Sequence, residues 1–198
     1  MATPADVLSY WFGAPAKNAD ELKAKLAFWF RGGPEVDATI AREFGAEVRA
    51  AIAGGLEEWM DEPKGWLALV VVLDQLTRNV FRGDARTHAG DARAVRITMD
   101  ALAAGKIAPL PVEERQFALM PLLHAEDPAC QARFAKEIRD VVAAAPDDLK
   151  KGFSAGVEQS DKYTEIIRRF GRFPHRNAIL GRASTPEEEE FLAVNRAR

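Results

Sequence analysis

The sequence predicts an all-α protein of about nine or ten helices, and three observations lead to this class. The chain is rich in Ala, Leu, Glu, Arg and Lys, which are good helix formers. No segment alternates polar and apolar residues in the way a half-buried strand does. Helix-start and helix-stop signals recur along the chain with short loops between them, which is typical of antiparallel helical hairpins.

The first three predicted helices begin at polar capping residues and end at glycine. Thr, Asn and Asp side chains accept hydrogen bonds from the free N–H groups of a first helical turn. Glycine readily adopts the left-handed conformation that ends a helix. These signals predict helices over residues 3–13, 18–33 and 37–55. In the third, apolar side chains recur every four residues from Ile40 to Ile52 and form one buried face.

The next predicted helix is the most apolar of the chain. It begins at Pro63 and continues through WLALVVVLDQLTRN to about Asn79. The apolar residues 66–73 are also compatible with a buried strand, but the sequence offers no partner strand and the pattern continues for too long. This run is far shorter than the roughly 20 residues that span a bilayer. We therefore expect a central, buried helix.

Further helices are predicted in the second half by the same signals. They cover residues 91–105, residues 111–123, a segment that starts at 127–128, a segment through Tyr163 that ends at Gly171, and a last helix from Thr185. The last begins with the sequence TPEE, a capping box with proline at the first helical position.

Composition and charge exclude several classes of protein. Lys and Arg total 27 against 30 Asp and Glu, so the net charge is −3 and the pI about 5.7, which argues against a nucleic-acid partner. The single cysteine, Cys130, excludes a disulfide framework and a multi-cysteine zinc site. The first residues lack the basic segment of a secretory signal. We expect a single all-α domain over residues 1–198, cytoplasmic, with no membrane or nucleic-acid partner.

Two charged residues lie on the buried face of the central helix. Asp74 and Arg78 are four residues apart, so their side chains are neighbours on one side of the helix. A charge pair in such a place is costly to desolvate. Two interpretations stay open: a structural pair that also caps backbone groups, or the polar wall of a cleft.

A second polar segment follows a predicted helix end. The sequence HAED places His124 and Glu126 in a junction loop before the helix that starts at 127–128. The favoured interpretation of His124 is a core histidine that is hydrogen-bonded to a carbonyl. The alternative is acid–base chemistry or metal binding with the nearby carboxylates.

The most informative segment spans residues 168–182, which contain five arginines, one histidine and no acid. Gly171 ends a helix and the following proline prevents its continuation, so Arg172, His175 and Arg176 are expected on a rigid turn. Because guanidinium groups bind carboxylates and phosphates in a bidentate manner, this excess predicts an anionic partner.

The alternative for these arginines is internal pairing. Arg172 or Arg176 would then neutralise the carboxylate of Asp74, Glu126 or Asp127. Histidines at 88, 124 and 175 lack the compact spacing of metal ligands, so no metal site is predicted, and His88 is interpreted as a surface or packing residue. Established catalytic motifs such as HExxH, the P-loop, GxSxG and GxGxxG are absent from the sequence.

The chain resembles a bacterial family known as domain of unknown function 924. The resemblance rests on VLSYWFG at 7–13, LALVVVLDQLTRNVFRG at 67–83, PLLHAED at 121–127 and IIRRFGRFPHRNAILGRASTPEEEEFL at 166–192. That family is similar in fold to tetratricopeptide (TPR) proteins, which implies a TPR-like array of antiparallel helical hairpins with a groove. It implies no established activity.

The resemblance carries over a set of hallmark polar residues without assigning them a role. They are Asp74, Gln75, Arg78, Asn79, Arg82, His124, Glu126, Arg172, His175, Arg176 and Asn177. Two departures concern His88, where members often have an aromatic residue, and Tyr163, where they often have a histidine. A mechanism that requires that second histidine is in doubt for this chain.

Three functional hypotheses follow. In the first, the three polar segments converge on one side of the groove and bind an anionic small molecule or a peptide. Arg78, Arg172 and Arg176 would hold the anionic group, while Gln75, His175 and Asn177 would orient it; Asp74, Asn79 and Arg82 complete the expected ligand-binding set.

In the second hypothesis the protein is a hydrolase or transferase. His124 or His175 would be the general acid or base, oriented by Glu126 or Asp74, and a metal held by both histidines and a carboxylate is a variant. In the third, the motifs are a structural salt-bridge network. The cofactor, the ligand and the oligomeric state are unknown from the sequence.

Overall fold

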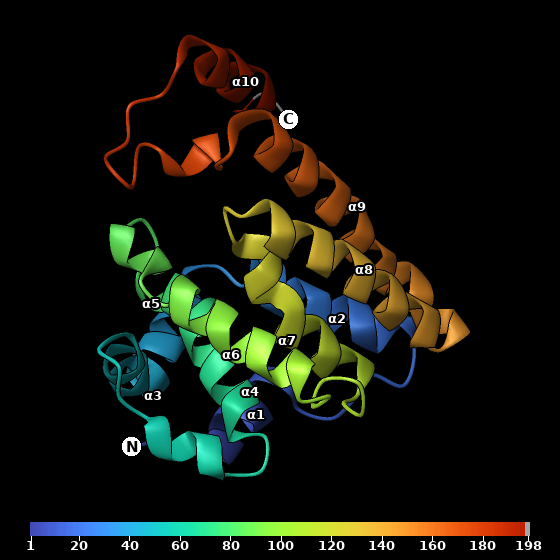
Figure 1. Ribbon diagram of the computed structural model, residues 1–198. Helices are drawn as coiled ribbons and strands as arrows, with labels where there is room; N and C mark the ends of the chain where they lie inside the picture. The colour runs from blue at the N-terminus through green and yellow to red at the C-terminus, as the bar shows by residue number, and fades with distance from the viewer. Residues whose placement is uncertain (197–198) are drawn as a thin grey trace.

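The computed structural model describes residues 1–196 and is all-helical over that range (Figure 1). The helices are α1 (Pro4–Phe12), α2 (Ala19–Arg31), α3 (Pro34–Ile52), α4 (Gly65–Val70), α5 (Thr77–Val80), α6 (Asp91–Ala103), α7 (Val112–His124), α8 (Pro128–Ala144), α9 (Asp147–Phe170) and α10 (Pro186–Arg196). A π-helical turn (Val71–Leu76) joins α4 to α5 into one continuous helix, which leaves nine helices in the described residues and confirms the predicted number.

The caps that the sequence predicts at Thr3, Asn18, Asp127 and Thr185 are present, whereas Asp37 lies inside α3 and does not cap it. Asn18 and Asp127 accept hydrogen bonds from backbone N–H groups three residues ahead. Thr3 with Asp6, and Thr185 with Glu188, bond reciprocally as capping boxes. Two predicted starts are wrong: the central helix begins two residues after Pro63, at Gly65, and the third helix begins three residues before residue 37, at Pro34. Proline is favoured in a first helical turn because it needs no hydrogen-bond acceptor there.

Short 3₁₀ turns, which the sequence analysis did not predict, connect several helices. They cover Glu57–Asp61, Ala85–His88 and Pro174–Arg176. Each is only three to five residues long, too short for a periodic apolar pattern. The last two nevertheless carry charged residues of the site described below.

The helix from α4 to α5 runs through the centre of the molecule. Every residue from Gly65 to Thr77 is buried, and α1, α3, α6 and α7 pack around it. The four tryptophans are buried, and Trp11 and Trp29 pack edge-on against Phe117. This packing explains why an apolar run of strand-like composition is helical: its side chains contact neighbours on all sides.

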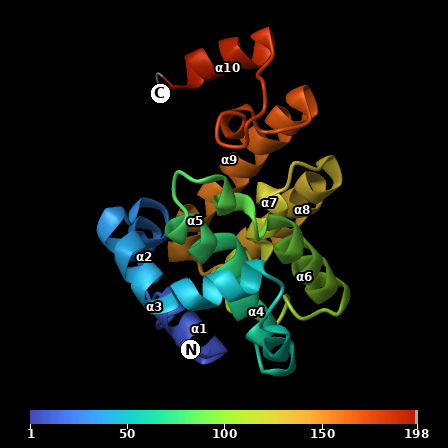
Figure 2. The ribbon, with the colours of Figure 1, turned by 90° about the vertical axis from the view of Figure 1, so that its left-hand side faces the viewer.

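The C-terminal part lies at one end of the molecule. Helices α7, α8 and α9 pack side by side, and α10 with its preceding loop stands beyond the end of α9, far from α1 (Figures 1 and 2). Gly171 ends α9 in the left-handed conformation (φ 67°), and the fully buried Phe173 anchors the chain that follows. No helix among residues 1–196 is both long and apolar enough to cross a membrane.

Candidate functional site

Asp74 lies at the centre of the candidate site and is fully buried on the π-helical turn. His124 Nδ1 lies 2.8 Å from its Oδ1, and Arg78 Nη1 lies 3.2 Å from the same oxygen. Gln75 donates from Nε2 to Oδ2 at 2.5 Å. Both oxygens of the buried carboxylate therefore have partners: His124 and Arg78 at Oδ1, and the Gln75 amide at Oδ2.

The backbone around Asp74 is wider than an α-helix. The N–H of Thr77 bonds the carbonyl of Val72, five residues back, and the Thr77 hydroxyl also donates to that carbonyl at 2.8 Å. Turns of this kind insert one extra residue and frequently mark functional sites. Here the turn lets consecutive residues, Asp74 and Gln75, contact each other and face the same polar cluster.

The charges in this cluster shift the pKa values of its acid and its base. Burial opposes ionisation of Asp74, but Arg78 and His124 outweigh it and lower its pKa to about 2. Burial lowers the pKa of His124 below its ordinary value, although the Asp74 carboxylate favours the protonated ring. At neutral pH, Asp74 is therefore an anion and His124 is neutral.

Asp91, at the start of α6, joins a second set of groups to the cluster. Its carboxylate lies 3.0 Å from Arg78 Nη2, 3.5 Å from Arg176 Nη1 and 3.2 Å from His88 Nδ1. The Arg176 guanidinium also stacks on the ring of Phe173, 4.6 Å from its centroid. Asp91 thus connects the central helix to the turn after α9.

A pocket of about 410 Å³ opens beside Asp74; we call it the arginine pocket. Its wall combines the corner between α2 and α3 with polar residues of the central helix and α7. The lining residues are Trp29, Phe30, Arg31, Gly32, Gly33, Pro34, Asp37, Gln75, Arg78, Asn79, Arg82, Met120 and His124. Five residues that the sequence analysis singled out line it: Gln75, Arg78, Asn79, Arg82 and His124.

The other predicted residues lie outside the arginine pocket. Glu126 accepts from Arg182 Nη1 at 2.6 Å and from the N–H of Phe173 at 2.8 Å. Arg172 binds Glu188 in a bidentate manner, and Asn177 donates to the same carboxylate at 3.2 Å. These contacts hold the C-terminal segment together.

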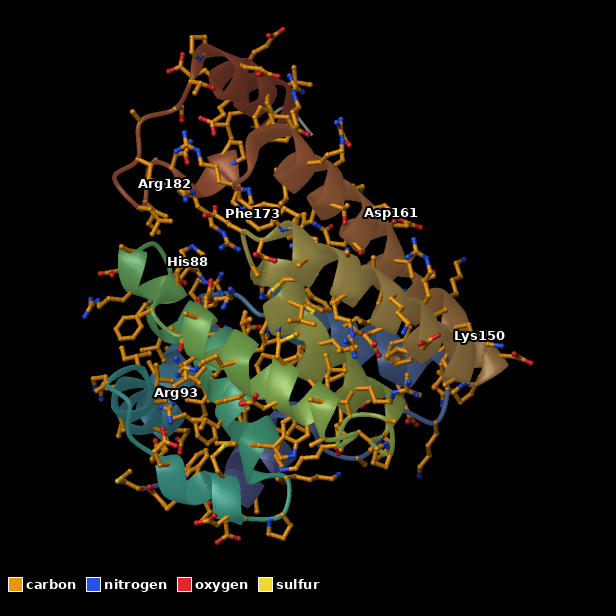
Figure 3. All side chains as sticks on the ribbon, in the orientation of Figure 1. His88, Arg93, Lys150, Asp161, Phe173 and Arg182 are labelled. Atoms are coloured by element: carbon orange, nitrogen blue, oxygen red, sulfur yellow. The ribbon has the colours of Figure 1, made fainter. Side chains whose placement is uncertain are left out.

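His175 lines a separate hollow between α9 and α10. This C-terminal groove measures about 1030 Å³ and is mainly apolar, with Tyr163, Ile166 and Phe191 among its lining residues. Burial lowers the pKa of His175 to about 4. Figure 3 places His88, Phe173 and Arg182 where the segment after α9 approaches the 3₁₀ turn Ala85–His88. Of the three predicted polar segments, the one at 168–182 therefore reaches the Asp74 cluster only through Arg176 and Asp91.

Two predictions about internal pairing need correction. Arg172 pairs with Glu188, and Arg176 approaches Asp91, instead of Asp74, Glu126 or Asp127. The carboxylate of Asp127 caps α8. The acids that neutralise these arginines thus come from helix starts that the sequence analysis had interpreted only as caps.

Sequence reasoning also missed several residues of the site. Asp91 was predicted only as a helix start, and His88 as a surface or packing residue, yet they bond each other at 3.2 Å. Asp37 binds both Asn79 Nδ2, at 2.8 Å, and Arg82 Nη2, at 2.9 Å. Arg31 lines the pocket but lies outside the recognised motifs. Among residues 1–196, no three His, Cys, Asp or Glu side chains are grouped to hold a metal ion.

The lowered pKa of His124 is expected to make the fold sensitive to mild acid. In the unfolded chain the pKa returns to about 6.5, so just below that pH the unfolded state binds more protons than the folded state. The free energy of unfolding should therefore fall as the pH drops below about 6.5. His175 should contribute in the same direction.

Urea denaturation at a series of pH values between 7.5 and 5 would check this expectation. In His124→Asn, the side-chain amide can still donate to Asp74 but does not titrate. We expect this variant to lose less stability than the wild type over the same pH range. Parallel profiles for the two proteins would contradict the assignment to His124.

Comparison with known proteins places this geometry in a family. Residues 7–195 match the family described as "Bacterial protein of unknown function (DUF924)". The structure is similar to that of the protein of unknown function ATU0120 from Agrobacterium tumefaciens, with a TM-score of 0.78, 31% sequence identity and 96% of each chain covered. No curated protein matches the chain. The matched length, nearly the whole chain, shows that this protein belongs to the bacterial DUF924 family of unknown function.

Proposed function

We propose that this protein binds a small anionic molecule, through a carboxylate or phosphate group, in the arginine pocket. The observation that carries the proposal is the charge of the wall: Arg31, Arg78 and Arg82 line it against one carboxylate, Asp37. Arg82 is paired with Asp37, and Arg78 with Asp74 and Asp91. Arg31 makes no ion pair within residues 1–196, so its guanidinium is available to a ligand.

The start of α3 supports the same proposal. Gly33 caps this 19-residue helix without a side-chain hydrogen bond, and Gly33 and Pro34 line the pocket. Apart from Pro34, which has no N–H, the first residues of the helix carry N–H groups without partners inside the helix and with partial positive charge, which favours a bound anion. Trp29, Phe30 and Met120 supply apolar surface for the rest of the molecule. The volume fits a small molecule, since such pockets span roughly 300–1000 Å³.

Arg31→Ala is the first test of this function. Inorganic phosphate and succinate serve as probes, and binding is followed by the amide chemical shifts of residues around the pocket. We expect saturable shifts in the wild type and binding at least about tenfold weaker in the variant, because one charge-assisted hydrogen bond is lost. The free energy of unfolding should stay nearly unchanged, since Arg31 is exposed and at a helix end.

Arg96→Ala is the matched control. Arg96 is also exposed and without an ion pair in the described residues, but it lies on α6 and does not line the pocket. It should bind both probes like the wild type. The proposal is wrong if neither probe produces saturable shifts at the pocket, or if Arg31→Ala and Arg96→Ala bind equally well.

The Asp74–His124 pair favours a second candidate, hydrolysis or group transfer by acid–base chemistry. The carboxylate holds Nδ1 at 2.8 Å, and the ring lines the pocket, which is the arrangement of an oriented general base. In that case Nε2 would take a proton from water as the water oxygen attacks a bound ester. The mono-p-nitrophenyl ester of succinic acid is a suitable probe: hydrolysis by the wild type that His124→Asn abolishes would support catalysis, and equal rates would exclude it.

The third hypothesis, a structural network, fits the residues of the C-terminal segment best. Arg172, Asn177 and Glu126 are engaged with internal partners and do not line the arginine pocket. We infer that they hold α10 and its preceding loop in place. Their part in a ligand site would then be indirect, through the position of Arg176.

A further inference from the structure

The buried carboxylate of Asp74 fixes the orientation of two neighbouring side chains. An ionised carboxylate can only accept hydrogen bonds, so each atom that faces it must be a donor. His124 Nδ1 lies 2.8 Å from Oδ1, and therefore carries the ring proton of the neutral imidazole. The amide group of Gln75 must likewise turn its NH₂ toward Oδ2, at 2.5 Å.

This orientation leaves one acceptor on each side chain. In the neutral ring the proton on Nδ1 leaves a lone pair on Nε2, and the Gln75 amide has its oxygen, Oε1, free. Within residues 1–196 neither acceptor has a hydrogen-bond partner. Neither atom is among the fully buried polar atoms without a partner, so both have some exposed surface. Both side chains line the arginine pocket, and we infer that their free acceptors are open to it.

The arginine pocket therefore offers two kinds of contact. Arg31, Arg78 and Arg82 supply positive charge, and His124 Nε2 with Gln75 Oε1 supplies hydrogen-bond acceptors. A plain dicarboxylate such as succinate satisfies only the arginines. The bound molecule would leave the acceptors unmatched unless it also carries a donor, and unmatched polar groups in a binding site weaken binding.

We propose that the ligand is a hydroxy acid: an anion with a hydroxyl group beside its charged group, which donates to His124 Nε2 or Gln75 Oε1. This inference rests on the proposed anion binding and narrows its ligand class. A hydroxyl fits better than an ammonium group, because an ammonium ion at this position would lie close to the Arg78 guanidinium, which is bonded to the same carboxylate. Burial keeps the pKa of His124 below its ordinary value, which preserves the acceptor at neutral pH.

Succinate, malate and aspartate form a matched set of probes. They share a four-carbon dicarboxylate skeleton and differ at one carbon, which carries hydrogen, hydroxyl or ammonium. Dissociation constants from chemical-shift titrations at pH 7.5 should show that the better enantiomer of malate binds at least about tenfold tighter than succinate. Aspartate should bind more weakly than malate.

The variant His124→Asn separates the acceptor from the rest of the site. Its amide nitrogen can occupy the place of Nδ1 and donate to Asp74, while the position of Nε2 becomes empty. The preference for malate over succinate should shrink to less than about threefold in this variant, whatever the change in the affinity for succinate itself. A merely structural role of His124 would change the affinity for both ligands by the same factor.

The outcomes distinguish this inference from the function on which it rests. If succinate and malate bind the wild type equally, the hydroxy-acid inference is wrong and anion binding stands. Tighter binding of aspartate than of malate would also overturn it, in favour of an amino acid. If none of the three binds, both the inference and the proposed function are wrong for carboxylate ligands.

Discussion

Replacing Asp74 by Asn is expected to lower the free energy of unfolding by about 3–5 kcal/mol, the usual cost of removing one partner from a buried ion pair. The Arg78 guanidinium would lose one of its two carboxylate partners and keep only Asp91, while its own side chain is only 20% exposed. The new amide group would place N–H donors against the donors of His124 or Gln75, where the native carboxylate accepts from both.

Urea denaturation measures this loss, and Asp84→Asn provides the control. Asp84 pairs with Arg86 at 2.8 Å, but both side chains are well exposed, so its replacement should leave the unfolding midpoint nearly unchanged. A change in Asp74→Asn as small as that in the control would show that the Asp74 carboxylate is solvated, contrary to its burial here.

The helix boundaries were predictable because the signals that set them are local. A cap such as Asn18 or Asp127 acts on N–H groups three residues ahead, so a short stretch of sequence contains both partners. The long helix α9 shows the limit. The apolar pattern around Tyr163 located its C-terminal half and its end at Gly171, but its start at Asp147 follows a proline without a side-chain cap.

The pairing of Asp74 with Arg78 was predictable for the same reason, since both lie on one turn. Its other partner, His124, comes from a helix 50 residues away. The sequence pattern indicated that His124 is a polar residue at the end of a helix, but it did not indicate that His124 lies next to Asp74. Long-range packing of α7 against the central helix brings the two together, and this packing is set by apolar side chains.

The basic segment 168–182 shows how a local charge count misleads. No acid occurs within it, so an external anion was predicted, yet its arginines find carboxylates elsewhere in the chain. The pairs are Arg168–Glu165, Arg169–Glu187, Arg172–Glu188, Arg176–Asp91 and Arg182–Glu126. Three of these acids lie within about 20 residues of their arginines along the chain. The other two, Asp91 and Glu126, join the segment to the body of the protein. Charge excess in a window predicts a partner but does not say whether the partner is internal.

Gly90→Ala is expected to cost about 3 kcal/mol of stability and to disturb the candidate site directly. A methyl group at Gly90 would lie 2.3 Å from the carbonyl oxygen of Leu73, much closer than any carbon–oxygen contact allows. Leu73 precedes Asp74 on the π-helical turn, and Gly90 precedes Asp91, so the close approach of these two backbones brings Asp91 to Arg78. Because the clash is with backbone, it can be relieved only by moving one of the two segments.

Gly156→Ala in α9 tests whether this effect is specific. A methyl group there would meet only side-chain carbons of Ile138, at 3.2 and 3.3 Å, and alanine favours the helix by roughly 0.5–1 kcal/mol. Its stability should therefore stay within about 1 kcal/mol of the wild type. If Gly90→Ala also stays within that range, the contact between the π-helical turn and the start of α6 is looser than described. A large loss at Gly90 alone would mean that backbone packing, rather than the Asp91–Arg78 ion pair, sets the distance between the π-helical turn and the start of α6.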